Sequence, residues 1–139
     1  YINLNVFFSG GLFDIDVKNK KLYYCLAGHP DNVIIKDGNV EILEGVGVVI
    51  GMSKNNDYQT KQVPFNRKDK LILMTDGLYE EFSDTGLELD LEGLLPVIEK
   101  NKNDSVEAII NRMDEFVHHF IGSGPVNDDI TAIGIEFVS

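Results

Sequence analysis

Residues 70–81 have the sequence KLILMTDGLYEE, and residues 127–131 have the sequence NDDIT. The apolar run at residues 71–74 is typical of a central strand that is buried on both faces. An Asp-Gly turn follows this strand directly, and the second acidic stretch lies at the start of a strand predicted over residues 130–138. If the two strands are antiparallel neighbours, both acidic stretches lie at the same edge of one sheet.

The first half of the chain has the pattern of antiparallel strands. Asp37-Gly38-Asn39 between two apolar runs is a strong hairpin signal, because glycine adopts the positive φ that tight turns require. The predicted strands cover residues 1–6, 11–17, 21–26, 33–36, 40–43, 45–51, 59–65 and 70–75. Because Tyr1 lies inside a predicted strand, we expect the chain to be a piece of a longer protein.

Two helices are predicted in the second half, before the final strand. Residues 91–100 have a helical pattern, and Pro96 is expected to kink this helix or to lie near its first turn. Residues 104–121 repeat apolar side chains every three or four positions, and Asp104 followed by Glu107 has the spacing of a capping box. Strands followed by helices and a last strand predict an α+β fold, with helices on one face of a largely antiparallel sheet.

The composition limits the classes of partner. We expect one domain over residues 1–139, since 43 % of the residues are hydrophobic and 25 % are charged. The net charge of −11 would repel nucleic acid and anionic lipid, so neither nucleic acid nor membrane is expected as a partner. The single cysteine, Cys25, cannot form an intrachain disulfide and suits a reducing compartment, so a cytoplasmic location is expected.

Three aspartates near the predicted sheet edge are the candidate site residues: Asp76, Asp128 and Asp129. Three ionised carboxylates repel one another at short range, so either they stay apart in water or a cation holds them. Aspartates without nearby Cys or His are hard ligands that suit Mg²⁺, Mn²⁺ or Ca²⁺. The plainer interpretation is an ordinary turn and a solvated loop, with Glu80 and Glu81 forming a solvated face.

Four motifs in this order resemble those of a known family. They are Ala-Gly-His-Pro at residues 27–30, Gly51, Thr-Asp-Gly-Leu-Tyr-Glu at 75–80, and Asp-Asp-Ile-Thr at 128–131. The chain resembles the C-terminal part of a metal-dependent serine/threonine protein phosphatase (PPM) domain, in the bacterial SpoIIE-like and RsbU-like branch. The resemblance implies an α+β fold of two mostly antiparallel β-sheets packed as a sandwich, with helices on the outside.

The resemblance also implies an activity, which is hydrolysis of phosphoserine or phosphothreonine by a water that bridges two Mn²⁺ or Mg²⁺ ions. It implies that Asp76 and Asp128 are metal ligands that act in catalysis through the bound metal, and that Asp129 is a weaker ligand. Gly77 and Thr131 would support the site structurally. The implied partner is a phosphorylated regulatory protein of the anti-anti-sigma type, and hence a role in sigma factor regulation.

The family's first metal-binding Asp motifs come before the segment that this chain matches. We therefore expect the N-terminal part of the domain to be missing, and residues 1–139 alone to bind metal weakly and to have little or no activity. Sheet edges exposed in this way favour a homodimer. The alternatives are a non-catalytic phosphatase-like module that binds or regulates a partner, and a structural domain stabilised by Ca²⁺.

Overall fold

The computed structural model describes residues 6–138, so the strand predicted over residues 1–6 lies outside the described part except for Val6. In chain order the elements are β1 (Gly10–Asp16), β2 (Lys21–Ala27), β3 (Asn32–Lys36), β4 (Asn39–Leu43), β5 (Lys61–Pro64), β6 (Lys70–Met74), the 3-10 helix η1 (Asp76–Leu78), β7 (Glu81–Phe82), β8 (Glu88–Leu89), α1 (Leu91–Asn101), α2 (Val106–Ile121) and β9 (Ala132–Glu136). Both predicted helices and the hairpins β1-β2 and β3-β4 are therefore present.

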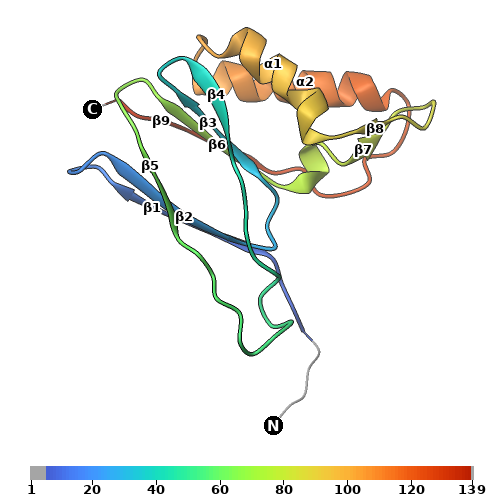
Figure 1. The fold of residues 1–139 in the computed structure, drawn as a ribbon. Coiled ribbons are helices and arrows are strands. Elements are labelled where there is room, and N and C mark those ends of the chain that lie inside the picture. The colour runs from blue at the N-terminus through green and yellow to red at the C-terminus, as the bar shows by residue number, and fades with distance from the viewer. Residues whose placement is uncertain (1–5, 139) are drawn as a thin grey trace.

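The elements form three layers (Figure 1). The two larger sheets have the strand orders β1-β2-β5 and β4-β3-β6-β9, and β7 and β8 form a separate two-stranded sheet, with antiparallel pairing throughout. Helices α1 and α2 cover the outer face of the four-stranded sheet, and the three-stranded sheet lies on the opposite side (Figure 1). The expected α+β sandwich of two mostly antiparallel sheets with helices on the outside is confirmed.

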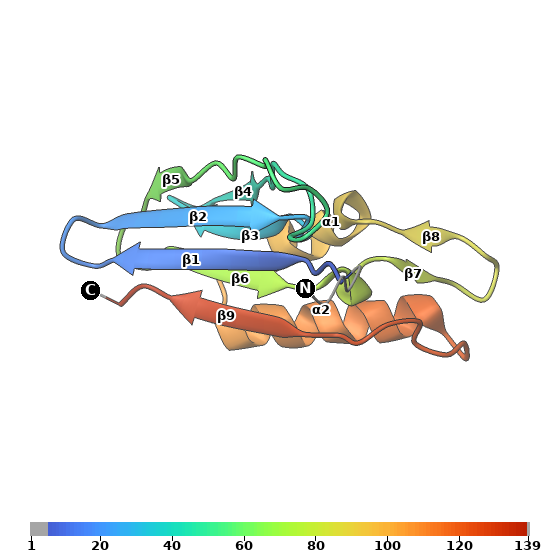
Figure 2. The same cartoon turned by 90° about the horizontal axis from the view of Figure 1, so that it is seen from below.

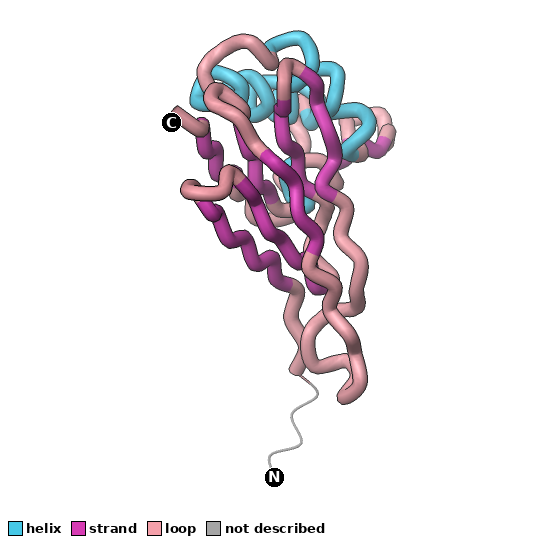
Figure 3. Tube along the Cα trace, turned by 60° about the vertical axis from the view of Figure 1, so that its left-hand side comes forward, coloured by secondary structure: helices cyan, strands magenta, loops and turns pink. Residues whose placement is uncertain are grey.

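Three connections pass from one sheet to the other: β2 to β3, β4 to β5, and β5 to β6. The longest loop, residues 44–60, leaves β4 of the four-stranded sheet and leads to β5 of the three-stranded sheet. It extends away from the helices, beyond the ends of the strands (Figure 3). Strands β1 and β9 are edge strands of their two sheets and lie on the same side of the sandwich (Figure 2). The homodimer expected from open edges stays a prediction.

Two apolar clusters lie on the two faces of the four-stranded sheet. The cluster on the helix side includes Ile72 and Met74 of β6, and the cluster between the sheets includes Leu71. Strand β6 thus contributes alternate side chains to both clusters, which confirms the prediction of a central strand. Complete burial of one such side chain stabilises the fold by about 1.5–3 kcal/mol relative to exposure. Within residues 6–138, no helix is both long enough and apolar enough to cross a membrane.

The pairing of β6 with β9 positions the candidate site. The two strands are antiparallel, with Met74 opposite Ala132 and Lys70 opposite Glu136. The residues that follow β6 therefore lie beside the residues that precede β9, although the two segments are more than 50 positions apart in the chain. This confirms the pairing on which the predicted meeting of the aspartate motifs depends.

Residues 45–51 do not form the predicted strand. Gly47 and Gly51 have positive φ values of 145° and 96°, which end an extended run, and only Ile50 forms an isolated bridge, with Phe8. The alternation of glycine and apolar residues thus predicted a strand where the structure has a loop with glycine bends.

Pro96 lies inside α1 rather than near its first turn.

The cap of α2 also differs from the prediction. The N-cap is Ser105, whose Oγ accepts the N–H of Ala108 at 3.2 Å, and Asp104 lies one residue before the cap. The backbone of Ser105 is extended (φ −61°, ψ 151°), as an N-cap requires. Serine and aspartate are about equally good caps, so the sequence pattern alone did not distinguish the two neighbours.

We expect Ser105→Ala to lower the free energy of unfolding by about 1 kcal/mol, because an N–H of the first turn of α2 loses its acceptor. Asp104→Ala is the matched control, and it should change stability by only a few tenths of a kcal/mol through the helix dipole. Urea denaturation followed by circular dichroism measures both. A larger loss in Asp104→Ala than in Ser105→Ala would contradict the observed cap.

Candidate functional site

The threonine that directly follows the central strand β6 joins the two acidic motifs. The N–H of Thr75 donates to the carbonyl oxygen of Thr131 at 3.0 Å, which continues the β6-β9 ladder by one residue. The Thr75 hydroxyl accepts the N–H of Thr131 at 3.0 Å and donates to the carbonyl oxygen of Asp129 at 3.1 Å. These bonds hold the loop of residues 127–131 against the turn that begins at Asp76.

Gly77 makes the close contact between the two motifs possible. A Cβ atom at this position would lie 2.6 Å from the carbonyl oxygen of Asp129 and 3.0 Å from its carbonyl carbon. Real Cβ atoms do not approach backbone atoms this closely, so a residue with a side chain would push the loops apart. Gly77 does not have a positive φ. Gly77 lies in the 3-10 turn η1, and what requires glycine there is the close approach of two backbones, because no positive φ is involved.

The three predicted aspartates lie on these two loops. Asp76 starts η1 and is half-buried, and its Oδ1 accepts the N–H of Gly77 at 3.1 Å. Asp128 and Asp129 are exposed, and Oδ1 of Asp128 accepts the N–H of Asp129 at 2.7 Å. Tertiary structure thus brings together two segments whose carboxylates are separated by about 50 residues in the chain.

The carboxylate oxygens are ligands of the kind that a hard divalent cation binds, but too few of these side chains come together to hold one. Oxygen ligands are those that Mn²⁺ and Mg²⁺ prefer. Among residues 6–138, however, no group of three or more His, Cys, Asp or Glu side chains is arranged to hold a metal ion. The described part of the chain therefore does not form a complete metal site by itself.

Glu81 is a residue of this region that sequence reasoning missed. It was interpreted as part of a solvated face, but it is fully buried, whereas its neighbour Glu80 is exposed. Its carboxylate accepts the N–H of Asn127 at 3.0 Å and the side-chain amide of Asn127 at 2.9 Å. Glu81 thereby holds the residue directly before Asp128. No local pattern distinguishes Glu81 from Glu80, because the partner is 46 positions away.

The Ala-Gly-His-Pro motif also reaches this end of the sheet. Asn32 is fully buried, and its amide donates to the carbonyl oxygen of Pro30 at 2.9 Å while its Oδ1 accepts the N–H of Met74 at 2.7 Å. These bonds tie the loop that carries His29 to the end of β6. His29 lines a cavity of about 180 Å³ together with Thr75 and Thr131. The cavity therefore borders the residues that adjoin the two acidic motifs, although none of the three aspartates lines it.

Tyr79 lies directly after the Asp76 turn, and the pKa of its hydroxyl is clearly raised. Its side chain is buried, and burial is the main cause that raises the pKa of its hydroxyl, with smaller effects from Asp31, Glu80 and Asp76. Both causes disfavour the tyrosinate form. The hydroxyl therefore stays protonated at neutral pH and does not serve as a base.

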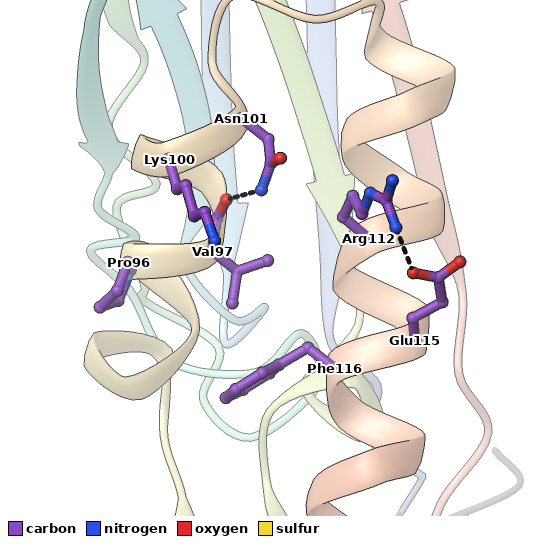
Figure 4. Close-up of a pocket in the computed structure, with 7 residues that line it drawn as sticks. All are labelled: Pro96, Val97, Lys100, Asn101, Arg112, Glu115 and Phe116. Atoms are coloured by element: carbon purple, nitrogen blue, oxygen red, sulfur yellow. Dashed lines mark hydrogen bonds and ion pairs between the residues drawn. The ribbon is translucent and has the colours of Figure 1, made fainter.

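A larger hollow lies in the helix layer and not at the aspartates. Its volume is about 620 Å³, and Val97 and Phe116 point into it from α1 and α2 (Figure 4). Three of its polar groups have partners on their own helices, since Arg112 donates to Glu115 at 2.8 Å and the Asn101 amide donates to the Val97 carbonyl. None of the three aspartates lines it, so it is not the candidate active site.

Comparisons with known proteins agree with the family resemblance seen in the sequence and with the observed fold. The family model for stage II sporulation protein E (SpoIIE) matches residues 2–138. Protein IcfG of Synechocystis is 28 % identical over 122 residues, which cover 87 % of this chain and 19 % of IcfG. The SiaA-PP2C domain of Pseudomonas aeruginosa has a TM-score of 0.80 at 22 % identity, over 93 % of this chain and 51 % of that one.

The phosphatase domain of SpoIIE from Bacillus subtilis, from a crystal presoaked with Mn, has a similar fold. It has a TM-score of 0.74 at 18 % identity, and the match covers 94 % of this chain and 56 % of that chain. At this identity the likeness shows the fold alone. The chain thus spans about half the length of these two solved phosphatase structures, and less than a fifth of IcfG.

We expect Gly77→Ala to lower the free energy of unfolding by about 1–3 kcal/mol, because the added methyl group displaces the 127–131 loop. Gly10→Ala is the matched control, since a Cβ there meets nothing closer than 3.9 Å. Thermal unfolding followed by calorimetry compares the two. Equal melting temperatures for the two variants would show that the loops do not pack as closely as the structure has them.

We expect Glu81→Ala to lower the free energy of unfolding by about 2–3 kcal/mol, because the backbone N–H and the side-chain amide of Asn127 lose their bonds to a buried, charged acceptor. Glu80→Ala, the exposed neighbour, should stay within about 0.5 kcal/mol of the parent chain. Chemical denaturation measures the difference. If the two alanine variants were equally stable, the Glu81–Asn127 contact would not hold the loop.

Proposed function

Because the chain belongs to the stage II sporulation protein E (SpoIIE) family, we propose that it is part of a phosphatase domain that hydrolyses phosphoserine or phosphothreonine on a regulatory protein. The observation that carries the proposal is the packing of the Asp76 turn against the Asp128–Asp129 loop, with Gly77 at the contact. The fold shared with the SiaA and SpoIIE phosphatase domains supports it. By resemblance, the regulatory protein is of the anti-anti-sigma type.

We propose that Asp76 and Asp128 are ligands of Mn²⁺ or Mg²⁺, with Asp129 as a weaker ligand. Their oxygen atoms are of the right chemical kind, and manganese was soaked into crystals of the related SpoIIE domain. Residues 6–138 contain no group of three such ligands, and in this proposal residues outside this part of the chain complete the site. Two bound divalent cations would supply an activated water and offset the charge of a phosphate.

The chain's own residues would hold this site in shape. The Thr75 hydroxyl and the Thr131 N–H fix the end of β6 to the start of the second motif. Glu81 fixes Asn127, and Gly77 allows Asp76 to approach Asp129. Positions held by both backbone and side-chain bonds are suited to ligands, because a ligand must stay within a fraction of an ångström of its working position.

The protein's net charge bears on the substrate. At −11 the protein repels a phosphorylated partner unless cations lie at the site, so we expect activity to depend on the metal. Residues 1–139 alone are expected to turn over little substrate. A second candidate function is a non-catalytic phosphatase-like module, which is favoured by the absence of a three-carboxylate group among residues 6–138.

The test is Mn²⁺-dependent dephosphorylation of a phosphoserine protein by the full natural chain that contains these residues. We expect Asp128→Asn to lower kcat/KM by about 100-fold or more, since weakening even an outer contact of a metal site costs 10- to 100-fold. Asp114→Asn is the control, because Asp114 is exposed on α2, and its one ion pair within residues 6–138 is with His118 at 3.4 Å. It should retain full activity.

Either of two results would contradict the proposal. One is a folded full-length chain that shows no turnover with Mn²⁺, Mg²⁺ or Ca²⁺, which would favour the binding module. The other is an Asp128→Asn variant that is as active as Asp114→Asn, which would remove Asp128 from the site. Activity of ordinary size from residues 1–139 alone would instead contradict the expectation that other residues complete the metal site.

A further inference from the structure

A basic cavity lies at the end of β6 opposite the candidate active site. The β3-β4 turn, the loop of residues 66–69 and the C-terminal end of α1 surround it, whereas η1 follows the other end of β6 (Figure 1). Its volume is about 340 Å³. A cavity of about 300–1,000 Å³ is typical of small-molecule sites.

The charge of this cavity is opposite to that of the whole protein. Four of the chain's twelve basic residues line it: Arg67, Lys68, Lys70 and Lys102. Two carboxylates, Asp37 and Asp69, also line it, so the cavity has a net positive charge in a protein of net charge −11. Such a local reversal of charge concentrates anions at this place.

Lys70 is a buried cation with unused donors. Lys70 is only 7 % exposed, and its Nζ donates to the carbonyl oxygen of Lys102 at 3.0 Å. This is the one hydrogen bond that Nζ makes to a residue between positions 6 and 138. An ammonium group has three N–H donors, so two have no partner among residues 6–138, and Lys70 lines the cavity. A buried charge is costly unless it is paired, which favours an anionic ligand here.

The acidic side chains of the cavity are already satisfied by the loops. Asp69 is buried and accepts the N–H groups of Asp37 at 2.9 Å and of Asn66 at 2.7 Å. Oδ1 of Asp37 accepts the side-chain amide of Asn66 at 3.0 Å. In contrast, Arg67 and Lys68 are exposed and form no ion pair with another described residue. The basic groups thus remain open to a ligand.

The loop that carries the two exposed basic residues is held firmly. The N–H of Lys68 donates to the carbonyl oxygen of Phe137 at 2.6 Å, and the N–H of Phe137 donates to the carbonyl oxygen of Asp69 at 3.0 Å. Lys102 pairs with Glu99 on α1, so it contributes less free charge than Arg67 or Lys68. The cavity is therefore a built feature of the fold and not a gap between mobile side chains.

We propose that this cavity binds a small ligand through a phosphate group. A guanidinium group such as that of Arg67 can donate two parallel hydrogen bonds to phosphate oxygens, and Lys70 would supply a buried point charge. The size and the enclosure by three segments favour a small molecule over a macromolecular partner. The proposal does not depend on the proposed function, because the cavity shares no residue with the acidic loops.

The test is calorimetric titration of the full natural chain with pyrophosphate and inorganic phosphate at constant ionic strength, with a chelator present to empty any metal site. We expect saturable binding with one site per chain, and about tenfold or more weaker binding by Arg67→Ala. Arg112→Ala is the matched control, because Arg112 is equally exposed but lies on α2. Asp128→Asn should bind as the parent chain does, which separates this cavity from the candidate active site.

Several results would overturn the proposal. They are the absence of saturable binding, equal binding by Arg67→Ala and Arg112→Ala, or loss of binding in Asp128→Asn. Citrate, a carboxylate of comparable charge, is the further ligand control. Weaker binding of citrate than of pyrophosphate supports a phosphate site, and equal binding contradicts it. Arg67 is exposed, so Arg67→Ala should keep the parent melting temperature, which a thermal scan checks.

Discussion

The close approach of Gly77 to the carbonyl group of Asp129 is the contact on which the candidate site depends. It joins two segments on either side of a helical hairpin, and it leaves no room for a Cβ atom. The Thr75 hydroxyl, which bonds to both Thr131 and Asp129, fixes the same two segments in register. Without this packing, Asp76 and Asp128 would be two unrelated loop residues.

Strand β6 connects the main parts of the molecule. Its side chains enter both apolar clusters, one under the helices and one between the sheets. Its two ends carry the two polar features of the protein, with the basic cavity at Lys70 and the acidic loops after Thr75. Because both faces of the strand are packed, its ends have little freedom to move, and groups attached to them are held in place.

Buried polar side chains fasten the loops around this strand. Four are buried among the described residues, and each bonds to a segment distant in the chain or to a turn: Asn32, Asp69, Lys70 and Glu81. Removing one partner of such a bond leaves the other unsatisfied in a buried place, which costs more than the bond itself contributes. These residues therefore act as determinants of loop position, at both ends of the sheet.

The sequence by itself determined the features that depend on local pattern. Alternation and turn residues gave the two hairpins, the three-to-four-residue repeat gave α2, and the uniformly apolar run gave the central strand. Tertiary structure alone decided the rest: that residues 45–51 bend at Gly47 and Gly51, that Ser105 caps α2, and that Glu81 is buried while Glu80 is not. The glycine bends and the burial of Glu81 depend on groups that are distant in the chain, and local pattern carries no record of such contacts. The cap of α2 is local, but Ser105 and Asp104 are about equally good caps, so the pattern did not distinguish them.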